Sequence, residues 1–389
     1  MKKIKALILS GFFAVSAFAN NYDVAAIIWP AYQPEPRWKE LGIFNHGNGE
    51  WQNVYEAKPK FEGHQQPIVP LWGYERDDDP IAVARKIDAA LASGINVFMY
   101  DWYWYQGRPF LENALNNGFL KAPNNERMKF FLMWANHDVN NLWNNKIGGK
   151  EKHNIHWKAD VSYEEFVNVL VPRFIEYFKK PNYYKLDGKP VFVMYDMRVF
   201  TRIGPEKAKQ AIQYFRKATK DAGFPGLVFW GRYSGLMRTI IPGKEDRSAT
   251  CEELVKYYDI EGGFAYGAWF NDYPHEKWAE LSIKKYDKEK AMGHYIPVVS
   301  TGWDNNPRFI ASEFTKITKG KDPIAYEKNL RVAKDWVDKN TPKGKRKIIL
   351  INAWNEWTEG GYLEPDKTYG YGFLNATARV FGGNGQSKK

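Results

Sequence analysis

Short apolar runs recur along the chain from residue 22 onward, and each is followed by a stretch with helical or loop character. Eight runs are apolar throughout rather than alternating, which is typical of strands covered on both faces. They occupy residues 24–32, 96–104, 130–136, 191–196, 227–233, 263–269, 296–303 and 348–354. Apolar positions with helical spacing predict helices at residues 81–91, 163–178, 205–222, 251–258, 274–286 and 324–340. This alternation predicts an α/β fold, specifically a (β/α)8 TIM barrel.

A doubly wound open sheet would show the same alternation. No glycine-rich dinucleotide or phosphate loop follows any of the strands, which removes the usual reason for that alternative. Long loops follow several strands, at residues 32–80, 137–162 and 234–250. In a barrel such loops gather at the C-terminal face, where active sites lie. We therefore expect one domain with long βα loops over residues 20–381.

The two ends of the chain are predicted to lie outside this domain. Residues 1–19 combine three early lysines, a short apolar run and an A-x-A sequence before Asn20, the pattern of a cleaved signal peptide. A buried N-terminal helix is the alternative. The apolar run is too short for a stable membrane anchor, so we expect an exported bacterial protein, periplasmic or extracellular. Residues 382–389 are rich in glycine and polar residues and are predicted to be a disordered tail.

Composition excludes several classes of protein. Among 389 residues, 44% are hydrophobic and 26% charged, which is globular. The net charge of +11 comes from lysines mixed with acids along amphipathic stretches, so we expect a solvated basic surface and no nucleic-acid partner. The single cysteine, Cys251, excludes an internal disulfide or a cysteine-based metal cage. His153 and His156 lack a third ligand at a usual spacing, so no metal and no cofactor are predicted. The oligomeric state is left open.

Aromatic residues make up 16% of the chain, and many stand at the ends of predicted strands beside a carboxylate, an amide or an arginine. Aromatic rings stack on the C–H faces of sugars, while the polar groups pair with sugar hydroxyls. The alternative is that many of these rings fill layers of the barrel. The pattern favours a carbohydrate partner. The candidate substrate-binding residues at these ends are Asp101, Trp102, Tyr103, Asn136, Tyr195, Arg232, Trp269, Trp303, Asp304, Arg308 and Trp357. Two roles are open for Arg308: it could bind a carboxylate or sulfate group of the substrate, or it could form a salt bridge to Asp304.

Two carboxylates, Glu356 and Glu359, stand three residues apart after the last predicted strand. Cleavage of a glycosidic bond needs two carboxyl groups around one bond, one of them a proton donor with a raised pKa. Trp354 and Trp357 would exclude water and raise one pKa by desolvation. The alternative is a helix N-terminus that carries acidic residues. The spacing alone leaves both alternatives open.

The same segment resembles the WbsX-like family. It reads I-N-A-W-N-E-W-T-E-G over residues 351–360 and Y-L-E-P-D over residues 362–366. That family is similar to glycoside hydrolase family 99, whose motif reads N-E-W-H-E-G. Further matching segments are residues 58–67, 103–104, 134–136, 187–192 and 302–308.

The resemblance implies a (β/α)8 barrel and a retaining glycosidase. It implies that Glu356 is the base that activates the sugar's own 2-hydroxyl, giving a 1,2-anhydro sugar, and that Glu359 is the acid. It places Tyr32 near the reacting sugar and implies α-mannosides or α-L-rhamnosides as substrates. The position of the family-99 histidine is occupied by Thr358 here. This difference weakens the inference that the chain acts on the same substrate as family 99. We expect His64 and Glu364 to have structural roles.

Two rival functions remain. The WbsX-like name comes from surface-polysaccharide gene clusters and suggests a glycosyltransferase. A non-catalytic barrel that binds glycans is the second rival. The predicted export signal and the lack of a phosphate-binding loop favour hydrolysis of a polysaccharide or glycan.

Overall fold

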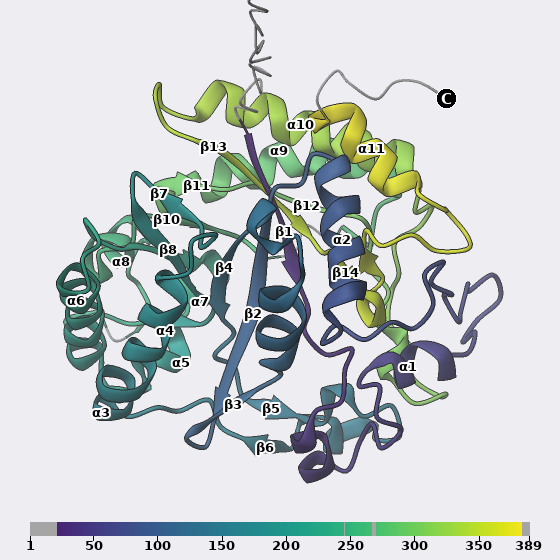
Figure 1. Cartoon of the computed structure of the whole chain (residues 1–389), viewed down its shortest axis with the longest axis horizontal. Coiled ribbons are helices and arrows are strands. Elements are labelled where there is room, and N and C mark those ends of the chain that lie inside the picture. Colours follow the sequence, from purple (N-terminus) through teal and green to yellow (C-terminus); the bar gives the residue numbers. More distant parts are fainter. Residues whose placement is uncertain (1–21, 245, 267–269, 383–389) are drawn as a thin grey trace, which may run out of the picture.

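The ring of strands at the centre of the molecule is the element that positions the site (Figure 1). The computed structural model describes residues 22–244, 246–266 and 270–382. The predicted signal peptide, all but the first residue of the predicted tail, and Trp269 lie outside the described residues. The ring strands are β1 (Tyr22–Ile28), β2 (Val97–Tyr105), β4 (Lys129–Trp134), β8 (Lys189–Met194), β9 (Val228–Arg232), β10 (Gly262–Phe264), β11 (His294–Tyr295), β12 (Val298–Ser300) and β13 (Lys347–Asn352).

Neighbouring strands of the ring are parallel, and β1 lies between β2 and β13 (Figure 1). β11 and β12 together fill one position of the ring. β11 pairs with β10, and β12 pairs with β13. Between them, Ile296 N–H donates to Gly263 O, and Pro297 O accepts from Leu350 N–H. Pro297 has no N–H of its own, which accounts for the interruption of the strand. The sheet therefore closes as a TIM-barrel-like single domain, which confirms the predicted fold class.

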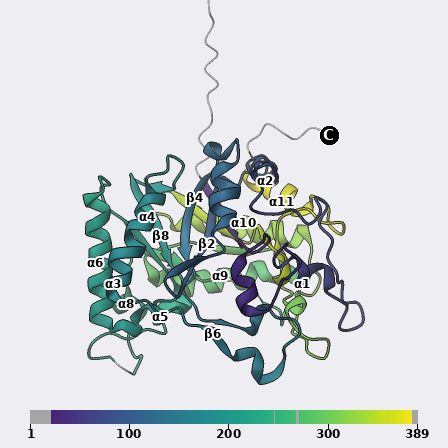
Figure 2. The same cartoon turned by 60° about the horizontal axis from the view of Figure 1, so that its bottom comes forward.

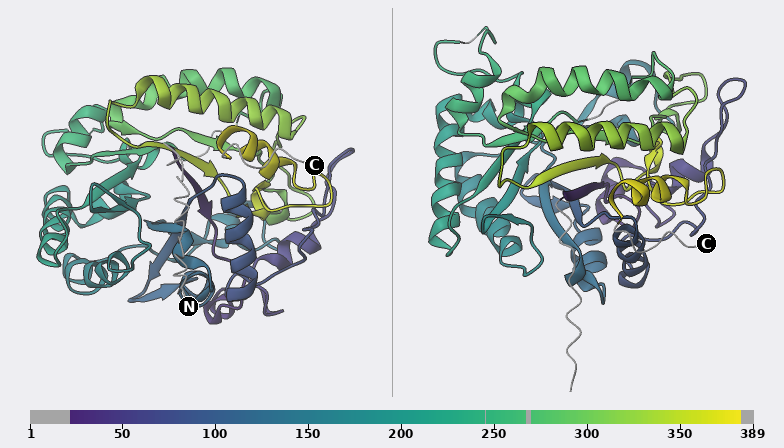
Figure 3. Two further views of the ribbon diagram at one scale, coloured as in Figure 1. Left: turned by 45° about the horizontal axis from the view of Figure 1, so that its top comes forward. Right: turned by 90° about the horizontal axis from the view of Figure 1, so that it is seen from above.

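Helices cover the outside of the barrel (Figure 2). The long helices follow the predicted ranges: α2 (Pro80–Ala92), α4 (Val171–Phe178), α6 (Pro205–Asp221), α8 (Cys251–Tyr258), α9 (Trp278–Glu289) and α10 (Pro323–Asn340), with α11 (Gly372–Phe381) after the last strand. α10 runs beside α9 (Figure 3). The predicted helix 163–178 is divided by a π-helical turn at Phe166–Leu170. Pro172 follows this turn and lacks the N–H that would continue a regular ladder.

The sequence pattern did not predict the short elements within the loops. The short helices are α1 (Trp51–Glu56), α5 (Met197–Phe200) and α7 (Tyr233–Leu236), whereas α3 (Tyr163–Glu165) is the first turn of the predicted helix 163–178. The short strands are β3 (Arg108–Phe110), β5 (Val139–Asn140), β6 (Ile155–Trp157), β7 (Lys185–Leu186), β14 (Asn355–Glu356) and β15 (Gly361–Tyr362). β14 and β15 pair with each other, as do β5 and β6.

The described residues form two hydrophobic clusters. The larger one fills the barrel and the layer between strands and helices. The smaller one joins the βα loops at the C-terminal end of the strands and is dominated by aromatic rings, among them Trp29, Trp38, Trp51, Trp143 and Trp357. Aromatic side chains bury a large area with few rotatable bonds, so they stabilise loops that have little regular structure. Many of the aromatic residues therefore form a second core, which supports the loops at the C-terminal end of the barrel.

Candidate active site

A cavity of about 280 Å³ lies at the C-terminal ends of the barrel strands. Its lining residues are Trp29, Asp101, Tyr103, Ala135, His137, Leu142, Trp143, Tyr195, Arg232, Tyr266, Trp303, Arg308, Glu356 and Glu359. The structure thus brings together both predicted catalytic glutamates and six of the predicted substrate-binding residues. Aromatic side chains and a few convergent polar groups are the usual lining of a ligand pocket.

The two glutamates stand on a tight turn after β13. Glu356 ends β14, and Glu359 ends the 3₁₀ helix Trp357–Glu359. The chain then reverses at Gly360, which has φ of 66°. A Cβ atom on Gly360 would lie 2.8 Å from the backbone nitrogen of Asp304, so this position requires glycine. Asp304 N–H donates to Glu359 O at 2.6 Å, which fixes the turn against the loop after β12.

Asn355 fastens the start of this turn to the first strand. Its side-chain oxygen accepts from Trp29 N–H at 2.8 Å, and its amide nitrogen donates to Trp29 O at 2.9 Å. Trp354 N–H donates to Ile27 O at 2.8 Å. The turn that carries the two glutamates is therefore aligned by β1, more than 300 residues earlier in the chain.

Arg308 holds three carboxylates at once. Its Nε and one terminal nitrogen donate to the two oxygens of Glu50, at 2.7 and 3.0 Å. The terminal nitrogens also donate to Glu356 at 3.0 Å and to Glu359 at 2.5 Å. The Arg308 side chain is only 3% exposed. Of the two alternatives for Arg308, the salt bridge to Asp304 is wrong, because all three guanidinium nitrogens donate to these glutamates.

Burial raises the pKa of both catalytic candidates. The pKa of Glu356 lies well above its usual value because of burial, although Arg308 opposes the shift. The pKa of Glu359 is raised by the same cause. Two carboxyl groups held by one guanidinium in a dry site favour a state in which one is ionised and the other holds a proton. This is the electrostatic condition for an acid and base pair.

Asp101 adds a further carboxyl group to the cavity. It stands on β2 and is 6% exposed, and its Oδ1 has no hydrogen-bond partner among the described residues. Burial raises the pKa of Asp101 well above its usual value, and Glu359 adds to the shift. A buried carboxyl without a partner is most stable in its protonated form.

Three predicted residues support the catalytic turn from behind it. Tyr32 is fully buried, and its phenol oxygen accepts from Trp357 N–H at 2.9 Å. The Trp357 indole stacks on Tyr362 with centroids 4.0 Å apart and donates to Glu364 at 2.7 Å. Tyr32 and Trp357 thus point away from the cavity, which corrects their prediction as substrate-binding residues. Glu364 also accepts from Trp354 and pairs with Lys86 on α2 at 2.7 Å, which agrees with a structural role.

Asp304 belongs to a neighbouring cavity of about 500 Å³ that shares Trp303 with the first. Its carboxylate accepts from His64 at 2.8 Å and from Gln66 at 2.8 Å. His64 Nδ1 accepts from Lys60 N–H at 3.1 Å, so the imidazole fixes its own loop. This arrangement agrees with the structural role expected for His64. It also corrects the prediction for Asp304, whose carboxylate is bound by protein donors.

Trp102 and Asn136 were predicted to bind substrate, and the structure corrects both. Side chains alternate along β2, so Trp102 points outward while Asp101 and Tyr103 point into the cavity. The Trp102 ring packs 5.0 Å from Phe174 of α4. Asn136 is buried, and its amide is bound to the backbone oxygen and nitrogen of Asp196, each at 2.8 Å. Asn136 therefore ties two strand ends together.

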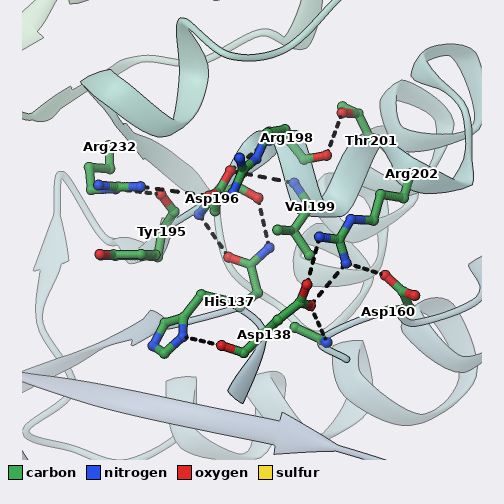
Figure 4. A network of polar contacts seen from close by, with 12 residues as sticks. His137, Asp138, Asp160, Tyr195, Asp196, Arg198, Val199, Thr201, Arg202 and Arg232 are labelled. Carbon is green, nitrogen blue, oxygen red and sulfur yellow. Dashed lines mark hydrogen bonds and ion pairs between the residues drawn. The ribbon is translucent and has the colours of Figure 1, made fainter. Parts of the chain in front are cut away.

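The wall of the cavity at the ends of β4, β8 and β9 includes His137, Tyr195 and Arg232, which Figure 4 shows on one side of a polar network. The Arg232 guanidinium lies 3.8 Å from the centre of the Tyr195 ring, and its Nε donates to Tyr195 O at 2.9 Å. The His137 ring lies 5.6 Å from the Tyr195 ring.

Two important residues were missed by the sequence analysis. Glu50 lies in the long loop after β1, and nothing in its local sequence indicates that it is buried against Arg308. His137 follows the predicted strand 130–136 directly, so its position at a strand end was the available signal. Within the described ranges, no three His, Cys, Asp or Glu side chains are grouped as a metal site. The described helices include none that is both long and apolar enough to cross a bilayer.

Comparison with known proteins gives one family and a set of structural relatives. The family model described as "Glycosyltransferase WbsX" matches residues 24–377. The uncharacterized protein WxcX of Xanthomonas campestris pv. campestris is 25% identical over 381 residues, which cover 92% of this chain and 49% of WxcX. The chain thus spans about half the length of the curated relatives it matches.

Solved structures of other proteins share the fold, and two of them follow. A glycoside hydrolase-like protein superposes with a TM-score of 0.58 and 15% identity, covering 92% of this chain and 94% of the other. The GH99 endo-α-mannosidase of Bacteroides thetaiotaomicron superposes with a TM-score of 0.51 and 14% identity, covering 92% and 96%. At this level of identity the likeness establishes a glycosidase-like fold.

Proposed function

The chain belongs to the WbsX glycosyltransferase family, and we propose that it is a retaining glycoside hydrolase acting on α-manno-configured bonds, α-mannosides or α-L-rhamnosides, of a polysaccharide or glycan. One observation carries the proposal. Two buried carboxyl groups, Glu356 and Glu359, share one arginine at the end of a cavity lined by aromatic rings. Their raised pKa values suit a site in which one group must give a proton and the other must take one.

In the proposed reaction, Glu356 takes the proton of the sugar's 2-hydroxyl. The 2-oxygen bonds to C1 while the bond from C1 to the leaving oxygen breaks, and Glu359 gives its proton to that oxygen. Water then adds to C1 and gives a proton to Glu359, while the 2-oxygen leaves C1 and takes its proton back from Glu356. The two displacements at C1 retain the configuration.

Contacts around Glu356 support its assignment as the base. Its Oε1 accepts from Arg308 at 3.0 Å and from the Thr358 hydroxyl at 3.2 Å, whereas among the described residues Arg308 is the sole donor to the Glu359 carboxylate. Donors to a carboxylate favour its ionised form, but burial raises the pKa of Glu356 further than that of Glu359, so the choice of Glu356 as base follows the resemblance to family 99 and not the order of the pKa values. Glu359 is also more exposed, 15% against 5%, which suits a group that must meet both the leaving oxygen and water.

The test is replacement of each glutamate by glutamine. Glu356→Gln and Glu359→Gln should each lower kcat/KM on a susceptible glycan by about 10²–10⁴-fold. The exposed Glu276, replaced in the same way, is the matched control and should leave the rate unchanged. NMR of the first-formed anomer should show retention. Inversion, or full activity in both glutamine variants, would refute the mechanism.

A transferase in polysaccharide synthesis is the second candidate, and the family description and the WxcX relative favour it. The same two carboxyl groups would then serve an acceptor hydroxyl in place of water. Turnover that requires a nucleotide sugar would support this candidate, whereas release of reducing ends without one supports hydrolysis. Residues 1–19 have the pattern of an export signal, so we also propose that the protein acts outside the cytoplasm.

A further inference from the structure

The two arginines that line the cavity differ in their bonding. Every nitrogen of Arg308 donates to a glutamate oxygen. Within the part of the chain that the structure describes, Arg232 donates from Nε alone, to Tyr195 O at 2.9 Å. Its nearest carboxylate is that of Asp196, 3.7 Å from a terminal nitrogen, which is beyond hydrogen-bond distance. Among the residues that the structure describes, neither terminal nitrogen of Arg232 has a hydrogen-bond acceptor.

The Asp196 carboxylate is already bound by other donors. Its Oδ1 accepts from Arg198 N–H at 3.0 Å and caps α5, and its Oδ2 accepts from the Arg198 guanidinium at 3.1 Å. It therefore neutralises Arg232 only in part. Arg198 itself is 42% exposed, compared with 11% for Arg232.

The other acids of this wall are also paired on the outer side. Asp138 binds Arg202 through two bonds of 2.9 Å, and Asp160 binds the same arginine at 2.7 Å. Figure 4 shows Arg198 and Arg202 on the side of the network away from His137, Tyr195 and Arg232. Of the arginines in this network, Arg232 is the one that lines the cavity, and its terminal nitrogens can donate to a ligand.

The surroundings of Arg232 suit a planar anion. Stacking on Tyr195 holds the guanidinium flat and leaves its terminal N–H groups as a fixed pair of donors. Such a pair matches the two oxygens of a carboxylate. His137 Nδ1 lies 3.1 Å from Asp138 O, an atom that can only accept, so Nδ1 carries the hydrogen. In the neutral imidazole Nε2 is then an acceptor, which suits a sugar hydroxyl beside the carboxylate.

We propose that Arg232 binds a carboxylate of the glycan, so that the substrate is an acidic polysaccharide with a uronic acid at or next to the cleaved bond. The inference rests on the proposed function and names its substrate class. It also accounts for the division of charge in the cavity. Arg308 is occupied by the protein's own acids and cannot attract an anionic substrate, whereas Arg232 is available and lies on β9, across the barrel from the catalytic turn.

The test uses two forms of one polysaccharide. The acidic form contains α-linked mannose or rhamnose beside a uronic acid, and in the reduced form the carboxyl groups have been chemically reduced. Wild type should show a kcat/KM about 10–100-fold higher on the acidic form, the range expected for hydrogen bonds to a charged group. Arg232→Gln should remove this preference, so that its kcat/KM on the acidic polymer falls to its value on the reduced polymer. Arg232→Lys should restore part of it, since lysine keeps the charge without the paired donors.

Arg198→Gln is the matched control, because Arg198 contacts the same Asp196 from the exposed side. It should keep the wild-type preference. An equal loss on both polymers in Arg232→Gln, or the same change in Arg198→Gln, would overturn the inference and indicate a structural role. A stronger preference for a sulfated polymer than for the uronate polymer would overturn the assignment to a carboxylate.

A binding measurement separates failure of this inference from failure of the proposed function. Calorimetry of the unmodified protein with acidic oligosaccharides and with their carboxyl-reduced forms requires no turnover. If no polymer is cleaved but acidic oligosaccharides bind at least tenfold more tightly, and Arg232→Gln removes that difference, the inference holds and hydrolysis is wrong. Equal binding of both forms would overturn the inference whether or not the protein hydrolyses glycans.

Discussion

The two walls of the cavity are built in different ways. The wall that carries the catalytic turn is made of loops from distant parts of the chain, and its charges are compensated within the protein, since Arg308 binds Glu50, Glu356 and Glu359. The opposite wall is made of the ends of β4, β8 and β9 and leaves Arg232 with spare donors. Reactive carboxyl groups need a fixed, desolvated environment, whereas a specificity group must keep bonds free for the ligand.

The largest effect is expected where the first wall loses its cation. Arg308→Met would leave three buried carboxylates without their counter-ion, which should lower the free energy of unfolding by about 3–5 kcal/mol. Denaturant titration at neutral pH measures it. Arg232→Met is the matched control and should cost less than about 1 kcal/mol, because its guanidinium is only partly paired. Equal losses in the two variants would remove the distinction between the walls.

A smaller effect is expected for Glu50→Gln, which tests whether Glu50 tunes the two catalytic groups. The variant loses one charged partner of Arg308, at a cost of about 1–3 kcal/mol. Because the negative charge of Glu50 contributes to the raised pKa of Glu356 and Glu359, both values should fall in the variant. Both limbs of the profile of kcat/KM against pH should therefore move to lower pH. A loss of activity with an unmoved profile would indicate a packing role only.

The smallest effect is expected for Asp101→Asn, between the two walls. Burial raises the pKa of Asp101 in the folded state above its unfolded value of about 3.9, so the folded state binds the proton more tightly. The stability contributed by the protonated carboxyl is present below that pH and is lost as pH rises through the folded pKa. Asparagine cannot ionise, so the variant should be more stable than wild type at pH 7 by on the order of 1 kcal/mol.

Thermal unfolding of both proteins from pH 4 to pH 8 checks this prediction. The difference between them should grow with pH. A constant difference across the range would mean that Asp101 is ionised in the folded protein throughout, with a partner in the cavity.

The sequence allowed the barrel and the grouping of Glu356 and Glu359 in one cavity to be predicted, because continuous apolar runs and a close carboxylate pair are local signals. The direction of side chains along β2 could not be predicted, since residues 98–105 are almost all apolar or aromatic and carry no alternation. Trp102 was misplaced for that reason. Glu50 could not be found either, because its burial depends on Arg308, 258 residues away. Contacts between loops so far apart in the sequence cannot be recognised from the local sequence pattern.

The two hydrogen bonds between the Asn355 side chain and the Trp29 backbone have a consequence for folding during synthesis. The turn that carries Glu356 and Glu359 takes its alignment from β1, and β1 is paired on one side by β13, which is synthesised more than 300 residues later. Contacts of such long range form late in folding. The nascent chain therefore completes the strand ends that carry Tyr195 and Arg232 long before the turn with Glu356 and Glu359 can be aligned, and the proposed acid and base come together only when β1 and β13 meet.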